Sequence, residues 1–159
     1  MITAERAIDV FNYEPLTGIL LWRISTGKRV HVGDEAGCVS DGYRRINLDG
    51  RSYRAHNIIW LIMTGEWPLR LIDHRDLDGA NNAWLNLRQA SDSQNCQNRR
   101  RFKNNTSGEK GIDSIFGLWR ARIQVNGLPV YLGLFEERPA AIAAYRAAAL
   151  KLHGDFARV

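Results

Sequence analysis

Four residues between positions 73 and 95 have types and a spacing that could act on a phosphate group. They are Asp73, His74, Asn86 and Asn95. Carboxylate and amide oxygens are ligands that Mg²⁺ accepts, with water and substrate phosphate completing the octahedron. A histidine titrates near neutrality and can take a proton from water. From spacing alone, purely local hydrogen bonding in turns and at a helix start stays the alternative.

The elements around these residues are expected to bring them together. We predict strands over residues 71–74 and 87–90, joined by a polar loop, and a helix that opens at Ser91. Gln94 lies three residues after Ser91, which is the pattern of a capping box. Asn95 therefore falls in the first turn of the helix, where it can face the end of the strand that holds Asp73. Because side chains alternate along a strand, His74 points to the opposite side from Asp73.

The first half of the chain carries further local signals. We predict a helix from Thr3 to about Phe11, a strand over 19–23, a hairpin of strands 43–48 and 51–55, and a helix over 56–64. Asp49-Gly50 is the sequence of a two-residue primed turn between the hairpin strands. Gly65 is placed to end the helix, and the glycine-rich segment 28–42 is predicted to be mainly loop.

The last third of the chain predicts a small sheet packed on one helix. Strands are expected near 111–116, 118–125 and 129–135, followed by a helix from Pro139 to just before Gly154. Along 118–125, apolar side chains alternate with Arg120, Arg122 and Gln124. In the next strand Val130, Leu132 and Leu134 are expected to face the helix, which leaves Tyr131 beside the arginines. Such a polar sheet face can enter a DNA major groove, although exposed strands also carry arginine for solubility.

Charge is distributed unevenly along the 159 residues, whose formal net charge is +5. Residues 1–95 hold 11 basic and 12 acidic side chains, whereas residues 96–159 hold 11 and 5. This asymmetry suggests that the second part meets a polyanion. Two cysteines form no disulfide framework, and neither a signal peptide nor a membrane span is apparent. We therefore expect an intracellular, cytoplasmic protein with no membrane partner.

The motifs at 72–95 resemble those of a known nuclease family. Ile72-Asp73-His74, Asn81-Asn82, Leu85-Asn86-Leu87-Arg88 and Ser93-Gln94-Asn95, with the preceding segment 53–60, resemble the HNH homing endonucleases and their ββα-metal finger. The resemblance covers about Leu16 to Arg100. It implies that Asp73 and Asn95 hold Mg²⁺, for which Mn²⁺ can substitute, and that His74 is the general base. Asn86 would hold the loop and orient His74.

Some residues of this region depart from the family pattern or have no assigned role. Arg75 and Leu77 stand where an apolar residue and a glycine are frequent in the family, which puts the shape of the loop in question. For His56 we favour a local hydrogen bond at the helix start over a role in the site. His31 and His153 have no partner pattern.

A second resemblance covers about residues 107–157. Lys110-Gly111-Ile112, Trp119-Arg120-Ala121-Arg122-Ile123, Tyr131-Leu132-Gly133-Leu134-Phe135 and Ala144-Tyr145-Arg146-Ala147-Ala148 resemble the plant ethylene-response-factor (Apetala-type) DNA-binding domain, which also occurs behind HNH nucleases in phages and bacteria. It implies DNA contacts through Lys110, Arg122, Gln124 and Tyr131, and Arg120 fits beside them. The basic run Arg99-Arg100-Arg101 is expected to contact phosphates as part of a linker.

These observations predict an α+β protein with an HNH nuclease domain at 1–97, a basic linker at 98–107 and a DNA-binding domain at 108–159. The expected activity is metal-dependent hydrolysis of double-stranded DNA, without a small-molecule cofactor. The sequence leaves the oligomeric state and the recognition site open. The alternatives are a non-catalytic DNA-binding protein that keeps the HNH scaffold and, less favoured, an RNA-binding module, because no run of exposed stacking aromatics is present.

Overall fold

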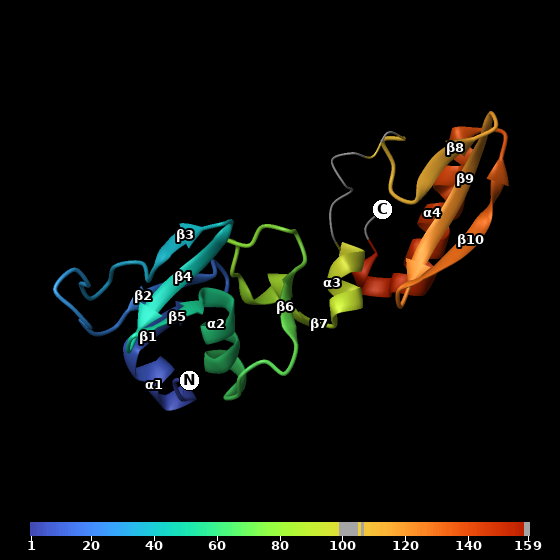
Figure 1. Ribbon diagram of the computed structural model, residues 1–159. Coiled ribbons are helices and arrows are strands. Elements are labelled where there is room, and N and C mark those ends of the chain that lie inside the picture. The colour runs from blue at the N-terminus through green and yellow to red at the C-terminus, as the bar shows by residue number, and fades with distance from the viewer. Residues whose placement is uncertain (99–104, 106, 158–159) are drawn as a thin grey trace. The chain divides into compact units, whose positions relative to one another are not determined.

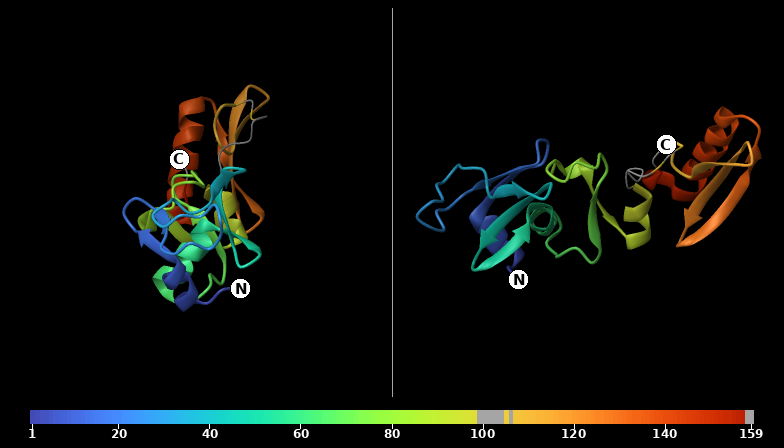
Figure 2. Two further views of the ribbon diagram at one scale, coloured as in Figure 1. Left: turned by 90° about the vertical axis from the view of Figure 1, so that its left-hand side faces the viewer. Right: turned by 45° about the horizontal axis from the view of Figure 1, so that its top comes forward.

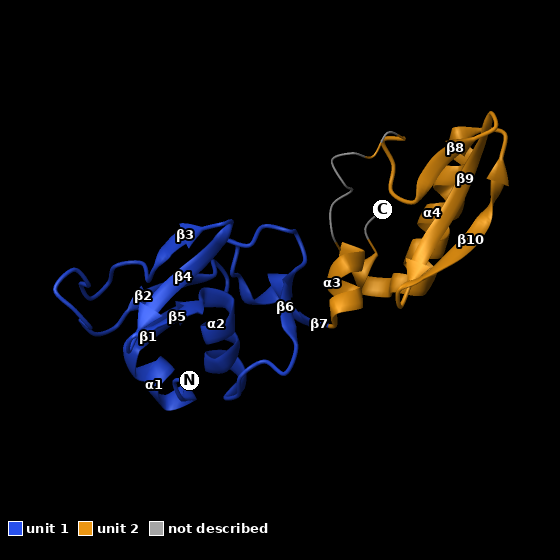
Figure 3. Cartoon of the chain, viewed as in Figure 1, with its two compact units in different colours: residues 1–90 blue, residues 91–159 orange. Residues whose placement is uncertain are grey.

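Small antiparallel sheets and short helices make up the chain in the computed structural model (Figure 1), which describes residues 1–98, 105 and 107–157. The architecture is mixed α+β, as predicted. The chain divides into two compact units, residues 1–90 and 91–159 (Figure 3). The helix that begins after Ser91 therefore belongs to the second unit, whereas the nuclease domain predicted from the sequence extends to residue 97.

The first unit holds three antiparallel sheets. Its elements are α1 (Ala4–Val10), β1 (Phe11–Glu14), β2 (Ile19–Trp22), β3 (Cys38–Ser40), β4 (Tyr43–Leu48), β5 (Arg51–Arg54), α2 (Ala55–Thr64), β6 (Leu71–His74), the 3₁₀ turn η1 (Trp84–Asn86) and β7 (Leu87–Ala90). The sheets have the orders β1-β2, β3-β4-β5 and β6-β7. Helix α2 packs on α1 and on the hairpin β4–β5, and this contact encloses the core.

Local signals explain most of these boundaries. Asp49 and Gly50 both have positive φ, at 49° and 74°, as a primed hairpin turn requires. The Thr3 hydroxyl accepts from the Arg6 amide at 3.2 Å and caps α1. Gly65 ends α2 in the left-handed region. The predicted first helix ends one residue early because Phe11 begins β1, where it pairs with Trp22 across the β1–β2 hairpin.

The second unit is a three-stranded sheet with a helix on one face. Its elements are α3 (Asp92–Asn98), β8 (Ile112–Ile115), β9 (Leu118–Val125), β10 (Leu128–Phe135), α4 (Arg138–His153) and the 3₁₀ turn η2 (Gly154–Phe156). Strand order is β10-β9-β8, and α4 lies along the sheet (Figure 2, right). Ala121 and Ile123 of β9 are buried against Ala141, Tyr145 and Ala149 of α4, which confirms the predicted alternation in β9.

A bulge in β10 overturns one expectation about that strand. The register of β10 on β9 shifts between Tyr131 and Gly133, so one residue of β10 is left unpaired. Beyond a bulge the two faces of a strand exchange. Leu134 consequently pairs with Arg120 on the outer face and is 48% exposed, so the prediction that it faces the helix is wrong. Phe135 packs into the core instead.

No helix among the described residues is long and apolar enough to cross a membrane.

Gly18 is predicted to tolerate a side chain poorly. Its φ is +78°, and a Cβ atom there would lie 2.2 Å from the backbone nitrogen of Ala83. Gly65 has φ +81° but open space around it, so it is the matched control. Gly65→Ala should cost about 1–2 kcal/mol for the left-handed conformation alone. Gly18→Ala should cost about 1–3 kcal/mol more, because a backbone must also move.

Urea unfolding midpoints of the two variants and the parent measure this difference. Equal losses for both variants would contradict the close approach between the β1–β2 turn and the loop that follows β6.

Candidate functional site

Strands β6 and β7 are joined by a buried ion pair. In their antiparallel register Asp73 lies opposite Arg88, and His74 opposite Leu87. Arg88 Nη2 lies 2.8 Å and Nε 2.9 Å from Asp73 Oδ2. The two side chains are only 8% and 4% exposed. Arg88 was not singled out from the sequence as part of the site, yet it neutralises the carboxylate that was predicted to bind a metal.

The candidate general base His74 is buried and held by an asparagine. Its Nε2 lies 3.3 Å from Asn82 Oδ1, and the residue is only 5% exposed. Burial lowers the pKa of His74 from its ordinary value of 6.5, although the Asn82 contact and three nearby aspartates oppose the shift. The imidazole is therefore neutral at pH 7, which is the form that can accept a proton.

His56 belongs to the surroundings of His74, contrary to the expectation of a merely local role. It lies in the first turn of α2, is 3% exposed, and its ring centroid is 5.0 Å from that of His74 in an edge-on arrangement. The ring of Tyr43 contacts both, with centroids 5.7 Å from His56 and 5.9 Å from His74. Burial, followed by the neighbouring His74 and Arg54, lowers the pKa of His56 to about 3.

Hydrogen bonds of the Asn86 side chain hold the loop between β6 and β7. Its Oδ1 accepts from the Asp76 amide at 3.1 Å, and its Nδ2 donates to the Asp76 carboxylate at 2.9 Å and to the Asn81 carbonyl at 2.8 Å. Burial opposes ionisation of Asp76, but hydrogen bonds from the Asp78 backbone, Asn81 and Asn86 outweigh it and lower the pKa of Asp76. The sequence prediction that Asn86 holds this loop agrees with these bonds.

Hydrogen bonds also join this loop to the β1–β2 hairpin, and they position Asn82. The Tyr13 hydroxyl donates to the Asn82 carbonyl at 2.8 Å, and the Trp84 amide donates to the Pro15 carbonyl at 2.9 Å. Asn82 is 2% exposed, and its Nδ2 donates to the Ala80 carbonyl at 3.1 Å. The sequence places Asn82 in the motif but indicates no role for it. The structure makes it the residue that contacts His74.

Leu77 occupies a backbone position that favours glycine. Its φ is +68°, and the left-handed region costs an L-residue about 1–2 kcal/mol. This position is the one at which the resembled family often has glycine. Hydrogen bonds around Asp76 and Asn86 hold the loop in this conformation.

Asn95 lies in α3, in the second unit. The predicted capping box at the start of that helix is confirmed, because the Ser91 amide donates to Gln94 Oε1 at 2.9 Å and the Gln94 amide to Ser91 Oγ at 3.2 Å. The metal-binding role of Asn95 stays a prediction. Within residues 1–98, 105 and 107–157, no group of three or more His, Cys, Asp or Glu side chains is placed to hold a metal.

The outer face of the second unit's sheet gathers the side chains predicted to contact DNA, together with an acid that was not foreseen. Arg122, Gln124 and Tyr131 are exposed, and Tyr131 pairs with Arg122. Asp113 of β8 lies opposite Arg120, pairs with its guanidinium and is 3.9 Å from Arg122 Nε. The Arg120 hydrogen bond lowers the pKa of Asp113, so this carboxylate stays charged.

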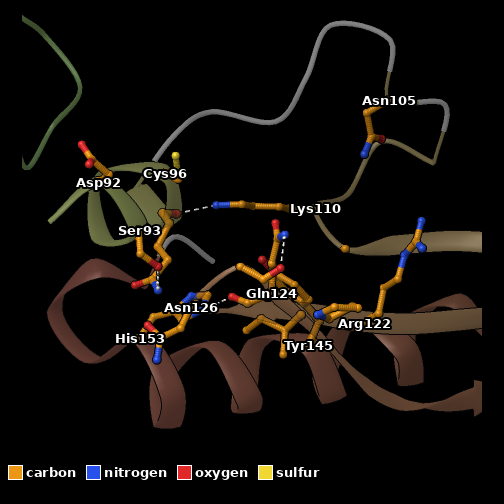
Figure 4. A pocket seen from close by; sticks show the side chains of 15 residues that line it. Asp92, Ser93, Cys96, Asn105, Lys110, Arg122, Gln124, Asn126, Tyr145 and His153 are labelled. Atoms are coloured by element: carbon orange, nitrogen blue, oxygen red, sulfur yellow. Dashed lines mark hydrogen bonds between the residues drawn. The ribbon is translucent and has the colours of Figure 1, made fainter.

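A cavity of about 860 Å³ lies within the second unit beside this face (Figure 4). Lys110, Arg122 and Gln124 line it together with Ser93 of α3. The Lys110 amine donates to the carbonyl of Gln97 at the end of that helix (Figure 4). Of the predicted contacts, Arg99, Arg100 and Arg101 lie outside the described residues.

Comparison with known families identifies the segment that contains His74. Residues 53–97 match the family model described as HNH endonuclease. The segment is thus an HNH endonuclease domain, which implies nucleic-acid endonuclease activity in general and a DNA substrate. No curated protein and no solved structure matches the chain, and the family match does not extend to the last third, where the resemblance to an ethylene-response-factor domain stays a prediction.

The ion pair between Asp73 and Arg88 is predicted to be essential to the fold of the first unit. Arg88→Ala breaks a buried ion pair by removing one partner, which typically costs about 3–5 kcal/mol. Arg6 is the control, because it pairs with Asp49 at 3.1 Å on the surface, with both side chains 40% or more exposed. Arg6→Ala should cost less than about 1 kcal/mol.

Chemical denaturation of both variants gives the comparison. Similar small losses would mean that water reaches the Asp73 carboxylate once Arg88 is removed, and would contradict a dry ion pair.

Proposed function

We propose that this protein is a metal-dependent DNA endonuclease in which His74 acts as the general base and the second unit docks on duplex DNA. One observation carries the proposal: a buried, neutral histidine stands at the signature position of a segment that matches HNH endonucleases, with a fixed hydrogen-bond partner. A buried base that keeps its neutral form at pH 7 is suited to take a proton from water.

The contacts of Asn82 select the nitrogen of His74 that acts. Because Asn82 Nδ2 donates to the Ala80 carbonyl, its Oδ1 is the atom turned to the imidazole. Nε2 of His74 then carries the proton, and Nδ1 is the nitrogen with a lone pair. In the proposed reaction Nδ1 takes a proton from water while the water oxygen forms a bond to phosphorus. The bond between phosphorus and the 3′ oxygen breaks, and the 3′ oxygen takes a proton from solvent. The resemblance implies products with 5′-phosphate and 3′-hydroxyl ends.

Asp73 and Asn95 are the residues that would hold Mg²⁺, or Mn²⁺ in its place. Their oxygen donors fit a hard cation. When bound, the metal ion supplies charge stabilisation to the phosphate and to the leaving 3′ oxygen. Arg88 in turn holds the Asp73 carboxylate in one orientation.

The buried pair between Asp73 and Arg88 also favours a second candidate function. If Arg88 satisfies Asp73 in place of a metal, the chain would bind DNA on an HNH scaffold without cutting it. Cleavage measured with and without divalent metal separates the two functions.

The second unit supports the docking part of the proposal. Arg122, Gln124 and Tyr131 are exposed on one sheet face, and arginine and glutamine side chains can read base edges in a major groove. Asp113 pairs with Arg120 and lies close to Arg122. We therefore assign Arg122, rather than Arg120, the larger share of the DNA contact.

Replacement of His74 tests the catalytic role. His74→Ala should lower the rate of plasmid cleavage in Mg²⁺ by about 10²–10⁴-fold, because a general base is lost, while the affinity for DNA stays the same. His31→Ala, which changes an exposed histidine, should cut like the parent. Plasmid nicking followed on agarose gels, with EDTA as the metal-free control, measures the rates.

Equal cleavage by the parent and His74→Ala would remove His74 as the base. An absence of cleavage in any divalent metal, with DNA binding retained, would favour the non-catalytic function.

Replacement of Arg122 tests the docking face. Arg122→Ala should weaken duplex binding and reduce the slope of log K against log salt by about 0.9, the value for one phosphate contact. Arg146 is exposed on α4, the helix that covers the other face of the sheet, so Arg146→Ala removes the same charge elsewhere. Fluorescence anisotropy of a labelled duplex over a salt series gives both slopes. Equal slopes for the two variants would contradict a docking role for this face.

A further inference from the structure

Two arginines of the first unit lie side by side on an exposed sheet face. In the hairpin β4–β5, Arg45 pairs with Arg54, and both side chains are exposed. Residues directly opposite on antiparallel strands have Cβ atoms about 4.5–5.5 Å apart, and like charges in such pairs destabilise the sheet. The stability of the hairpin therefore does not explain this pair.

Arg44 and Arg88 of the same unit have strong internal partners, unlike this pair. Arg44, on the opposite face of β4, lies 2.7 Å from a Glu35 carboxylate oxygen and donates to the Gly37 carbonyl. Within the described part of the chain, the carboxylate near Arg45 is that of Asp41, at 4.0 Å and on a side chain that is 83% exposed. Such exposed pairs contribute little. Among the described residues, no carboxylate lies within 4.0 Å of Arg54.

Arg54 stacks on an aromatic ring that also lies beside the candidate base His74. Its guanidinium carbon lies 4.6 Å from the ring centroid of Tyr43, and the same ring centroid is 5.9 Å from that of His74. Tyr43 and Arg45 are two residues apart on one strand, so Tyr43 is the diagonal neighbour of Arg54 on the same face. A guanidinium stacked on a ring keeps its planar N–H donors available for an anion.

The polar character of the face continues away from His74. Asn47 and Ser52 form the next pair on this side of the hairpin, and both are exposed. Neutral amide and hydroxyl groups commonly contact the phosphates and sugars of DNA. The face thus presents, in order from His74, an aromatic ring, two arginines and two neutral polar side chains.

We propose that this face of the β3–β4–β5 sheet binds the backbone of duplex DNA, with Arg54 on the phosphate at the cleavage point and Arg45 on a neighbouring phosphate. Two observations favour DNA as the partner. The two arginines are complementary in charge to phosphates, and the Tyr43 ring lies beside both Arg54 and His74. The inference rests on the proposed nuclease function. It gives the first unit a DNA-binding surface of its own, whereas the sequence analysis predicts DNA contacts in the second unit and the linker.

Equilibrium binding tests the surface without any cleavage. The full chain binds a fluorescent duplex in EDTA over a salt series, as the parent and as Arg45→Gln, Arg54→Gln and Arg51→Gln. Arg51 is the matched control because it is an exposed arginine of the same strand β5 that points to the other face, opposite Leu48. Arg45→Gln and Arg54→Gln should each reduce the salt slope by about 0.9, and Arg51→Gln should leave it unchanged.

Cleavage kinetics in Mg²⁺ test which arginine serves the reacting phosphate. At saturating DNA, Arg54→Gln should lower kcat by about 100-fold, as removal of a transition-state charge contact typically does, whereas Arg45→Gln should mainly raise KM. Arg54→Lys should restore the salt slope but not the full kcat, because lysine lacks the planar fork.

The proposal that this face binds DNA would be wrong if Arg45→Gln and Arg54→Gln had the same salt slope as the parent. It would also be wrong if Arg51→Gln reduced the slope as much as they do. A kcat of Arg54→Gln equal to that of Arg45→Gln would overturn the assignment of Arg54 to the cleavage point. If the parent cuts no DNA, the proposed nuclease function fails, yet the binding series in EDTA still decides whether this face binds DNA.

Discussion

The buried ion pair between Asp73 and Arg88 fixes the register of the two strands that carry the candidate site. A two-stranded sheet is marginal by itself, and β6 and β7 are only four residues each. A slip by one residue would separate the two charges and move side chains to the other face. Buried, unpaired charges cost several kcal/mol (roughly 3–5), so this pair selects one register. That register places His74 opposite Leu87. It also brings the start of the loop to Asn86, whose Oδ1 accepts a hydrogen bond from the Asp76 amide.

Burial decides the chemistry that His74 and its neighbours can perform. Three rings, those of Tyr43, His56 and His74, meet where β4, α2 and β6 come together. Desolvation disfavours the charged form of both histidines. The site therefore holds neutral imidazoles in a setting that three aspartates and one arginine border.

Five arginines of the described residues illustrate two different environments. Arg44, Arg88 and Arg120 bind carboxylates of their own unit and hold strands together. Arg54 and Arg122 are exposed, and their positions on sheet faces make them the side chains best placed to contact an outside anion. The amino-acid composition does not distinguish arginines with internal partners from exposed ones. The net charge of residues 1–95 is therefore a poor guide to whether the first unit binds DNA.

The sequence by itself determined what depends on neighbouring residues. The Asp49-Gly50 turn, the Thr3 cap, the Ser91–Gln94 capping box, the end of α2 at Gly65 and the alternation in β9 all follow from local backbone preferences and side-chain period. The motif around His74 was equally readable, because its residues lie close together in the chain, and the family match covers them.

Only the tertiary structure decided which distant residues meet. Arg88 on Asp73, His56 and Tyr43 on His74, Tyr13 on Asn82 and Asp113 on Arg120 join separate elements, and nothing in the local pattern specifies such partners. The bulge that turns Leu134 outward is likewise a property of two paired strands. Local preferences act over a few residues, whereas contacts between elements depend on how the whole unit packs. Hence the candidate base could be read from the sequence, and the residues that hold it could not.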